Sequence, residues 1–289
     1  MHLGLVTPVL IQHPSTRSDW EATAEIDEVA QIAETADRLG FHHLTCSEHI
    51  AVPTEIAGER GGTYWDPLAT LGYLAARTRT IRLATQVLVL GYHHPLEIAK
   101  RYGTLDRVSN GRLVLGLGVG TLKEEFDLIN APFTDRGARA DDALAALRTS
   151  LSTPLPEYHG EFYDYSGFVV EPHAVQPRVP LWIGGRTKRS LRRALTHGDG
   201  WVPFGLRLSE LADMLAAAPL PENFDVILST GAAFDPLGDP ERVVRSLTRV
   251  RDAGATIAST SISASSAEHF AEQLEELHRI ALAEGIDFT

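Results

Sequence analysis

Short apolar segments alternate along the chain with longer segments in which apolar residues recur at helical spacing. Residues 81–90 and 112–120 are nearly continuous apolar and β-branched runs, which are typical of strands buried on both faces of a parallel sheet. Between them, a segment that Pro95 opens places its apolar residues on one side of a helix and ends at Asn110-Gly111. The pattern predicts two parallel strands joined by a helix in a right-handed βαβ unit.

The same alternation continues over the whole chain. The predicted strands span residues 2–9, 42–47, 81–90, 112–120, 179–183, 201–204, 225–229 and 256–260. The predicted helices span residues 26–39, 66–77, 95–109, 134–151, 187–196, 208–217, 240–253 and 267–283. This alternation over 289 residues predicts an α/β fold, a (β/α)8 TIM-type barrel that forms a single domain over residues 1–289.

Two segments interrupt the regular pattern. Residues 48–64 contain several glycines and are predicted to form a long loop that could act as a lid. Residues 152–178 lack helical periodicity and are predicted to form an extended insertion before strand five, with a hairpin as one interpretation.

Charge and composition exclude several classes of function. The chain has 26 basic and 38 acidic residues, and a formal net charge of −12 makes nucleic acid an unfavourable partner. A single cysteine, Cys46, excludes an internal disulfide and a cysteine-based metal cluster. The first residues lack the basic region of a signal peptide, and no apolar run reaches membrane-spanning length. We therefore expect a cytoplasmic protein with no membrane partner.

Candidate catalytic side chains follow the second predicted strand. In barrels of this kind the active site lies at the carboxyl ends of the strands, so residues just after a strand are the first candidates for active-site residues. His49 can donate or accept a proton near neutral pH, and Glu48 is close enough in sequence to orient it. A histidine and a carboxylate on a surface loop are the alternative interpretation.

Glycine-rich segments follow two further predicted strands. Gly184-Gly185-Arg186-Thr187 opens a helix, so free backbone N–H groups and a guanidinium predict an anion site, such as one for a phosphate. A glycine turn with solvated arginines explains the same residues. Gly118-Val119-Gly120 lacks the spacing of a dinucleotide-binding turn, and close packing at the barrel rim is its alternative interpretation.

The paired histidines raise the question of a metal site. His42 and His43 are adjacent on a predicted strand, so we expect their side chains to face opposite ways and not to share an ion. His93 and His94 lie in a loop without partnering carboxylates at fixed spacing. The sequence therefore predicts no catalytic metal.

Several short motifs occur together in a fixed order. They are Ser47-Glu48-His49, Tyr64-Trp65-Asp66-Pro67, Asp106-Arg107-Val108-Ser109-Asn110-Gly111-Arg112, Gly116-Leu117-Gly118-Val119-Gly120 and Leu181-Trp182-Ile183-Gly184-Gly185. In order and spacing they resemble the luciferase-like superfamily of flavin and deazaflavin oxidoreductases, and most closely its actinobacterial branch of coenzyme F420-dependent enzymes. The resemblance runs from about Val6 to Phe204. It implies a barrel that binds its cofactor at the carboxyl ends of the strands, usually as a homodimer.

The resemblance also assigns roles to individual positions. His49 matches a histidine near the reactive ring, and Gln86-Val87 matches a non-prolyl cis peptide bulge that backs the ring. Gly118, Val119 and Gly120 match the strand-four loop that runs along the cofactor. Gly184, Gly185 and Arg186 match a loop on the phosphate side of the cofactor. Some relatives use an acid a few residues beyond the strand-four glycines. Because Lys123 stands near that place, this role is not carried over to Glu124.

The function implied is hydride transfer between coenzyme F420 and a small organic substrate, in either direction. His49 is the expected proton donor or acceptor and Glu48 its orienting partner. Glu48 stands where deazaflavin members commonly have aspartate, so an FMN-dependent luciferase-like monooxygenase is the alternative enzyme. A barrel that binds a flavin without turning it over is a third hypothesis.

Overall fold

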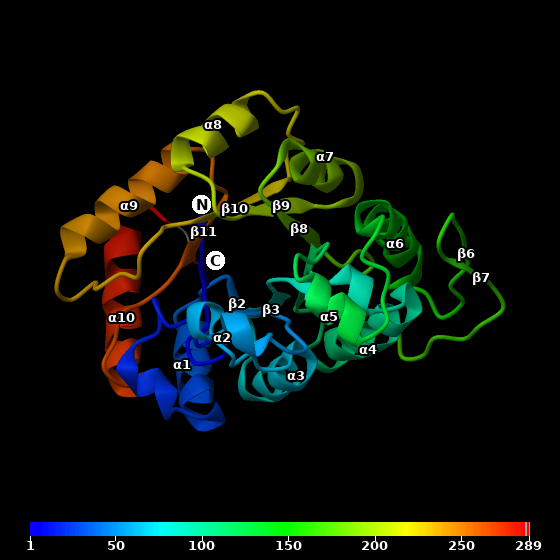
Figure 1. Ribbon diagram of the computed structural model, residues 1–289. Coiled ribbons are helices and arrows are strands. Elements are labelled where there is room, and N and C mark those ends of the chain that lie inside the picture. The colour runs from blue at the N-terminus through cyan, green and yellow to red at the C-terminus, as the bar shows by residue number, and fades with distance from the viewer. Residues whose placement is uncertain (287, 289) are drawn as a thin grey trace.

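The computed structural model describes residues 1–286 and 288, and shows a ring of parallel strands surrounded by helices (Figure 1). The strands of the ring are β1 (His2–Leu5), β2 (His43–Cys46), β3 (Arg82–Thr85) with β4 (Leu88–Val89), β5 (Leu113–Gly118), β8 (Leu181–Gly185), β9 (Gly200–Pro203), β10 (Asp225–Ser229) and β11 (Ile257–Thr260). Their order is β3-β2-β1-β11-β10-β9-β8-β5, and pairing of β3 with β5 closes the ring. All of these pairs are parallel, which confirms the predicted (β/α)8 barrel.

Most of the helices cover the outside of the ring. In chain order, the helices are α1 (Ile26–Arg38), α2 (Thr54–Arg60), α3 (Pro67–Arg77), α4 (Pro95–Val108), α5 (Lys123–Leu128), α6 (Arg136–Ser150), α7 (Lys188–His197), α8 (Leu208–Ala216), α9 (Pro240–Asp252) and α10 (Ala267–Ala283). The short helices α2 and α5 lie instead in the loops after the strands. The carboxylates of Asp66 and Asp239 cap α3 and α9 at their first turns. The apolar helix α3 buries Leu71 and Leu74 inside this chain, so its composition does not require a partner subunit. The homodimer stays a prediction.

A separate cluster of apolar side chains fills the inside of the strand ring. Its members are Ala84, Val114, Trp182, Val202, Ile227 and Ile257. Alternate residues of a barrel strand point into the ring, so strands far apart in sequence meet in one layer. The Trp182 indole is fully buried and donates to Asp225 Oδ2 at 2.9 Å. This layer plugs the ring, and the space left for a ligand lies at the mouth formed by the strand ends.

Two local predictions need correction, and one short helix is missing from the prediction. The segment 81–90 is not one strand, because a break at Gln86-Val87 separates β3 from β4. The predicted loop 48–64 contains α2, which has no buried residue and therefore no apolar stripe that the sequence could reveal. Residues 123–128 form α5, a helix too short for its periodicity to be recognised.

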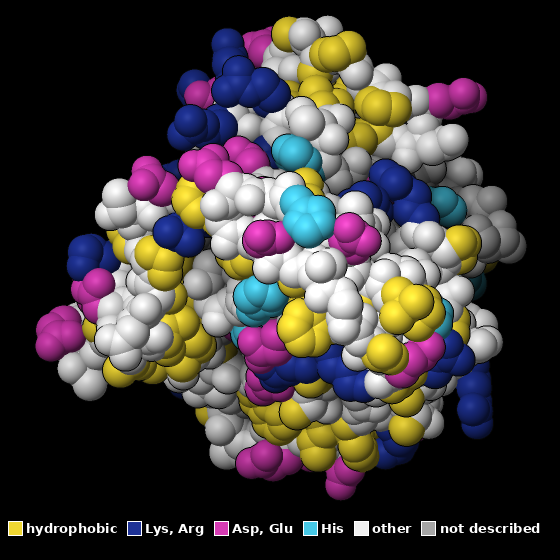
Figure 2. All heavy atoms as spheres, turned by 90° about the vertical axis from the view of Figure 1, so that its right-hand side faces the viewer, with side chains coloured by type: hydrophobic (Ala, Val, Ile, Leu, Met, Phe, Trp, Pro, Cys, Tyr) yellow, Lys and Arg dark blue, Asp and Glu magenta, His cyan; other side chains and the backbone are white. Residues whose placement is uncertain are grey.

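The predicted insertion before strand five is an antiparallel hairpin. Its strands are β6 (Tyr158–His159) and β7 (Asp164–Tyr165), and it lies beyond α6 at the right-hand edge of Figure 1. Figure 2 views this side of the molecule and shows hydrophobic, acidic and basic side chains next to one another. Large exposed apolar side chains of the insertion include Leu155, Phe168 and Val169. Within the part of the chain that the structure describes, no helix combines the length and apolar character needed to cross a membrane.

Candidate functional site

A cavity of about 540 Å³ opens at the carboxyl ends of the barrel strands. Its apolar floor includes Val6, Val202 and Ile227, which come from β1, β9 and β10 or the loops after them. The predicted site residues that border it are Glu48, His49, Gln86, Val87, Gly118, Val119, Gly120, Gly184 and Gly185. The barrel therefore gathers residues from widely separated segments around one space, as parallel strand ends must.

The other two predicted residues do not line this cavity. Thr187 is exposed, and its hydroxyl accepts the Ser190 N–H at 3.2 Å as the cap of α7. Arg186 is also exposed, with its Cδ 4.0 Å from the place where a Cβ on Gly205 would lie. Gly205 borders the cavity, so Arg186 stands at the rim rather than inside.

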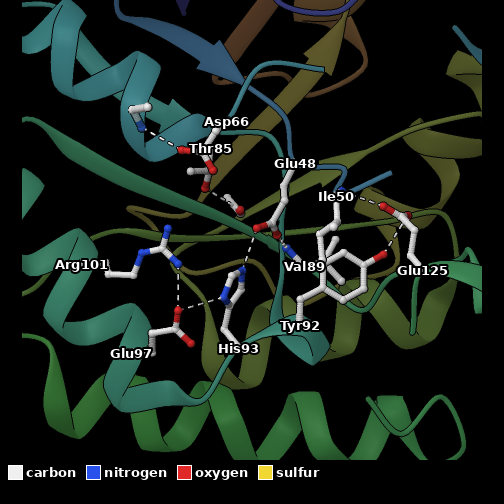
Figure 3. Close-up of polar contacts among 12 residues, drawn as sticks. Glu48, Ile50, Asp66, Thr85, Val89, Tyr92, His93, Glu97, Arg101 and Glu125 are labelled. Atoms are coloured by element: carbon white, nitrogen blue, oxygen red, sulfur yellow. Dashed lines mark hydrogen bonds and ion pairs between the residues drawn. The ribbon is translucent and has the colours of Figure 1, made fainter. Parts of the chain in front are cut away.

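His49 is held by a carboxylate that the sequence did not pair with it. His49 Nδ1 lies 2.8 Å from Oε2 of Glu125, whose side chain is only 1 % exposed. The same carboxylate accepts the Tyr92 hydroxyl at 2.8 Å and the Ile50 N–H at 2.8 Å (Figure 3). The Tyr64 ring meets the His49 ring edge-on at a centroid distance of 4.4 Å. The histidine is thus fixed in orientation on the cavity wall.

Electrostatics define the state of this pair. Burial raises the pKa of Glu125, but hydrogen bonds from His49, Tyr92 and Ile50 outweigh it and hold that pKa below its ordinary value. Burial and the neighbouring Glu125 carboxylate raise the pKa of Tyr92. Glu125 is therefore ionised and can only accept hydrogen bonds, so His49 carries a proton on Nδ1. Its Nε2 forms no hydrogen bond within residues 1–286 and 288.

The predicted orientation of His49 by Glu48 is wrong. Glu48 Oε1 lies 2.7 Å from Nε2 of His93, and its Oε2 accepts the Val89 N–H at 2.7 Å (Figure 3). Neighbouring residues at a strand end project in different directions, so adjacency in sequence separates these two side chains. Burial lowers the pKa of His93, but Glu48 more than offsets this and holds that pKa above its ordinary value. Glu48, which borders the cavity, and His93 therefore form an ion pair of their own.

The Gln86-Val87 segment forms the predicted bulge. Its peptide bond is cis, as the resemblance implies. The Val87 side chain stands between two glycines, because a Cβ on Gly118 would lie 2.6 Å from Val87 Cγ2 and one on Gly184 2.8 Å from Cγ1. These glycines therefore make room for the bulge, and through it shape the cavity floor.

The lining has features that fit a flat heteroaromatic cofactor. Its floor is apolar, while Ser47, Glu48, His49 and Tyr92 place polar groups along one side. Gln86 borders the cavity, and its buried Oε1 lacks a hydrogen-bond partner in the described part of the chain. A ring N–H or hydroxyl of a flavin or deazaflavin would satisfy that oxygen.

Sequence reasoning did not single out Tyr92, which lines the cavity, or Glu125, the carboxylate that bonds both Tyr92 and His49. The available signal was the acidic pair after the glycines at the end of β5, within Lys123-Glu124-Glu125-Phe126. Glu124 is exposed, whereas Glu125 and the next residue, Phe126, are buried. Phe126 anchors the short helix α5, which turns Glu125 inward. Glu124, the acid that the resemblance brought into question, is the exposed one.

The histidine pair at the opposite end of the barrel also departs from expectation. The two Nδ1 atoms of His42 and His43 lie 3.0 Å apart, so these side chains do not face opposite ways. β2 begins at His43, and strand alternation therefore does not govern His42. Burial lowers the pKa of His42 to about 2 and that of His43 to about 3. Among the described residues, no cluster of three or more His, Cys, Asp or Glu side chains could hold a metal ion.

Solved structures of other proteins share this fold. A solved monooxygenase, RslO1 from Streptomyces bottropensis, has a TM-score of 0.76 at 23% identity and covers 99% of this chain and 100% of its own. An F420-dependent secondary alcohol dehydrogenase in complex with an F420-acetone adduct has a TM-score of 0.75 at 14% identity, covering 96% of this chain and 98% of its own. At these identities the likeness establishes the fold alone.

Sequence relatives establish the family. An uncharacterized protein of Mycobacterium tuberculosis is 30% identical over 208 residues, which cover 68% of this chain and 72% of that protein. The oxygenase component of a flavin-dependent trigonelline monooxygenase from Acinetobacter baylyi is 28% identical over 194 residues, 65% of this chain and 51% of that protein. The model of the family described as luciferase-like monooxygenase matches residues 1–219. The chain therefore belongs to the luciferase-like monooxygenase family of oxidoreductases.

Proposed function

We propose that the protein transfers a hydride between coenzyme F420 and a small organic substrate bound in the cavity at the strand ends. The cofactor, when bound, supplies the hydride chemistry, and the protein supplies orientation and proton transfer. The observation that carries this proposal is the buried Glu125 carboxylate, which fixes His49 on the cavity wall. A redox step that creates or removes a C–O or C–N double bond requires such a proton donor or acceptor.

His49 acts through its Nε2 in this proposal. With Nδ1–H bound to Glu125, the neutral ring presents an unprotonated Nε2 that can take a proton. For an alcohol substrate, bound F420 would supply the hydride acceptor, and Nε2 of His49 would take the hydroxyl proton as the alcohol becomes a carbonyl. In the reverse direction His49 returns the proton to the heteroatom. Glu125 stabilises the imidazolium that forms in between, and the proton and hydride together balance the two-electron step.

Glu48 has a positioning role instead. Its carboxylate ties the Val89 backbone to His93, and its own N–H donates to Val87 O at 3.2 Å. These bonds hold the backbone at Val87, within the bulge, and at Val89, just after it. Loss of Glu48 is therefore expected to affect cofactor binding more than proton transfer.

The choice of F420 rests on the motif resemblance and on F420-dependent enzymes among proteins of the same fold. An FMN-dependent monooxygenase is the second candidate, supported by the flavin-dependent trigonelline monooxygenase relative. A barrel that binds a flavin without turnover is the third. The apolar floor and the unpartnered Gln86 amide suit both kinds of ring.

Parallel binding titrations with F420 and FMN, followed by assays with a panel of alcohol, enone and imine substrates, test the proposal. We expect F420 to bind more tightly and to change redox state without oxygen. Tight FMN binding with oxygen-dependent product would overturn it, and binding without turnover on any substrate would favour the third candidate. The His49→Ala variant should keep cofactor affinity and lose turnover, whereas His159→Ala, on the exposed hairpin, should change neither.

A further inference from the structure

A second cavity of about 450 Å³ adjoins the first at the barrel mouth. The two cavities share Pro203, Phe204, Gly205 and Ser229, which lie at the ends of β9 and β10. The second cavity continues outward between α8 and α9, the two helices at the upper left of Figure 1. A ligand in the first cavity could therefore extend into the second without crossing the protein.

The lining of the second cavity is basic on one side and apolar on the other. Arg242, Ser246 and Arg249 lie on one face of α9, at i, i+4 and i+7. Side chains of the α8 segment, including Leu208 and Leu211, form the opposite wall. No carboxylate is among the lining residues that the structure describes, although the chain as a whole has a net charge of −12.

The two arginines of this cavity are available to a ligand. Within residues 1–286 and 288, neither guanidinium forms an ion pair, and that of Arg242 donates only to the Ala232 carbonyl oxygen at 3.3 Å. By contrast, Arg245 on another face of α9 pairs with Glu241 at 3.3 Å and with Asp239 at 3.9 Å. Unpaired guanidinium groups beside an apolar wall favour phosphate or carboxylate ligands, because the low-dielectric wall strengthens the attraction.

We propose that the second cavity binds the anionic tail of the deazaflavin cofactor, and this inference rests on the proposed function. F420 continues beyond its ring and ribityl chain into a phosphodiester and a series of glutamate carboxylates, whereas FMN ends in a single phosphate. The two cavities meet at Gly205, and Arg186, an exposed residue whose Cδ lies 4.0 Å from the Cβ position of Gly205, brings a third basic residue to this junction. The position of these cations beyond the ring cavity matches a long polyanion better than one terminal phosphate.

Binding measurements with and without the tail test this assignment. The dissociation constants of F420 and of its precursor Fo, which lacks the phosphodiester and the carboxylates of the tail, are measured by fluorescence on the wild type and on Arg249→Gln, Arg242→Gln and the double variant. Arg245→Gln is the matched control, since it removes a charge from α9 outside the cavity. Melting temperatures are measured alongside, and Arg249→Gln carries the test if loss of the Arg242–Ala232 bond disturbs folding.

We expect each cavity variant to weaken F420 binding by about tenfold, as the loss of one charge-assisted contact implies, and to leave Fo binding unchanged. Added salt should weaken wild-type F420 binding more than Fo binding. Equal F420 affinity in wild type and double variant would overturn the inference while leaving hydride transfer intact. A raised substrate KM with unchanged F420 affinity would assign the cavity to an anionic substrate and also overturn it. Failure of the wild type to bind F420 would remove the proposed function itself.

Discussion

Replacing Glu125 by glutamine should reverse the tautomer of His49. The carboxylate accepts four hydrogen bonds, at 2.8 Å from His49 Nδ1, Tyr92 and Ile50 N and at 3.3 Å from Ala51 N. A glutamine amide keeps one oxygen, which the two backbone N–H groups require because they cannot change from donor to acceptor. Its NH2 group then faces His49 and donates to Nδ1. The neutral ring must carry its proton on Nε2, where it can no longer accept one from a substrate.

The size of the effect follows from this geometry. In the variant, returning the proton to Nδ1 would place two donors face to face and break a neutral hydrogen bond worth about 0.5–1.5 kcal/mol. The imidazolium formed during turnover also loses its buried counter-charge. The same change in a Ser–His–Asp triad lowers kcat by about 10⁴ because the tautomer is wrong. We expect kcat for Glu125→Gln to fall by about 10² to 10⁴, with cofactor affinity nearly unchanged.

Two measurements check this reasoning independently. Nitrogen-15 NMR of histidine-labelled protein, with the His49 signals assigned by their loss in His49→Ala, reports the tautomer without any turnover. Stopped-flow measurement of the cofactor absorbance reports the hydride-transfer step. Glu124→Gln is the matched control, because this neighbouring acid is exposed. A glutamine variant that keeps the Nδ1–H tautomer and the wild-type rate would refute the role given to Glu125.

Two further predictions concern the buried histidine pair and the contact between Gly118 and Val87. Folding lowers the pKa values of His42 and His43 from 6.5 to about 2 and about 3, so the unfolded chain binds more protons than the folded chain below pH 6.5. The free energy of unfolding therefore decreases as the pH is lowered. Each histidine should cost about 2 kcal/mol of unfolding free energy between pH 7.5 and pH 5, and urea titrations in which the pH 5 stability is undiminished would contradict their burial as neutral rings. A Cβ at Gly118 would lie 2.6 Å from Val87 Cγ2, so Gly118→Ala should displace the bulge and weaken cofactor binding. Val87→Ala in the same chain should restore binding measured by fluorescence, and failure of this rescue would show that Gly118 acts in some other way.

The barrel is predictable from the sequence because its signal is repeated. Each buried parallel strand is an apolar run, and each covering helix carries an apolar stripe, so a single doubtful element does not change the alternation. The elements that escaped prediction, α2 and α5, are short, and α2 buries none of its side chains. Helix-forming residues without a buried stripe leave no periodic pattern, even where the helix forms part of the rim.

The site is only partly predictable, and the two carboxylates show the physical reason. Glu48 is adjacent to His49 in sequence but pairs with His93, which is 45 positions away, whereas the partner of His49 is 76 positions away. The strand end fixes which side chains reach the cavity wall, and so the positions of His49 and Glu48 could be predicted. Their partners come from the loops and short helices after other strands, which the closing of the ring brings together. Local sequence therefore identifies a candidate acid–base residue. The group that sets its tautomer has to be looked for in the segments that follow the neighbouring strands of the barrel.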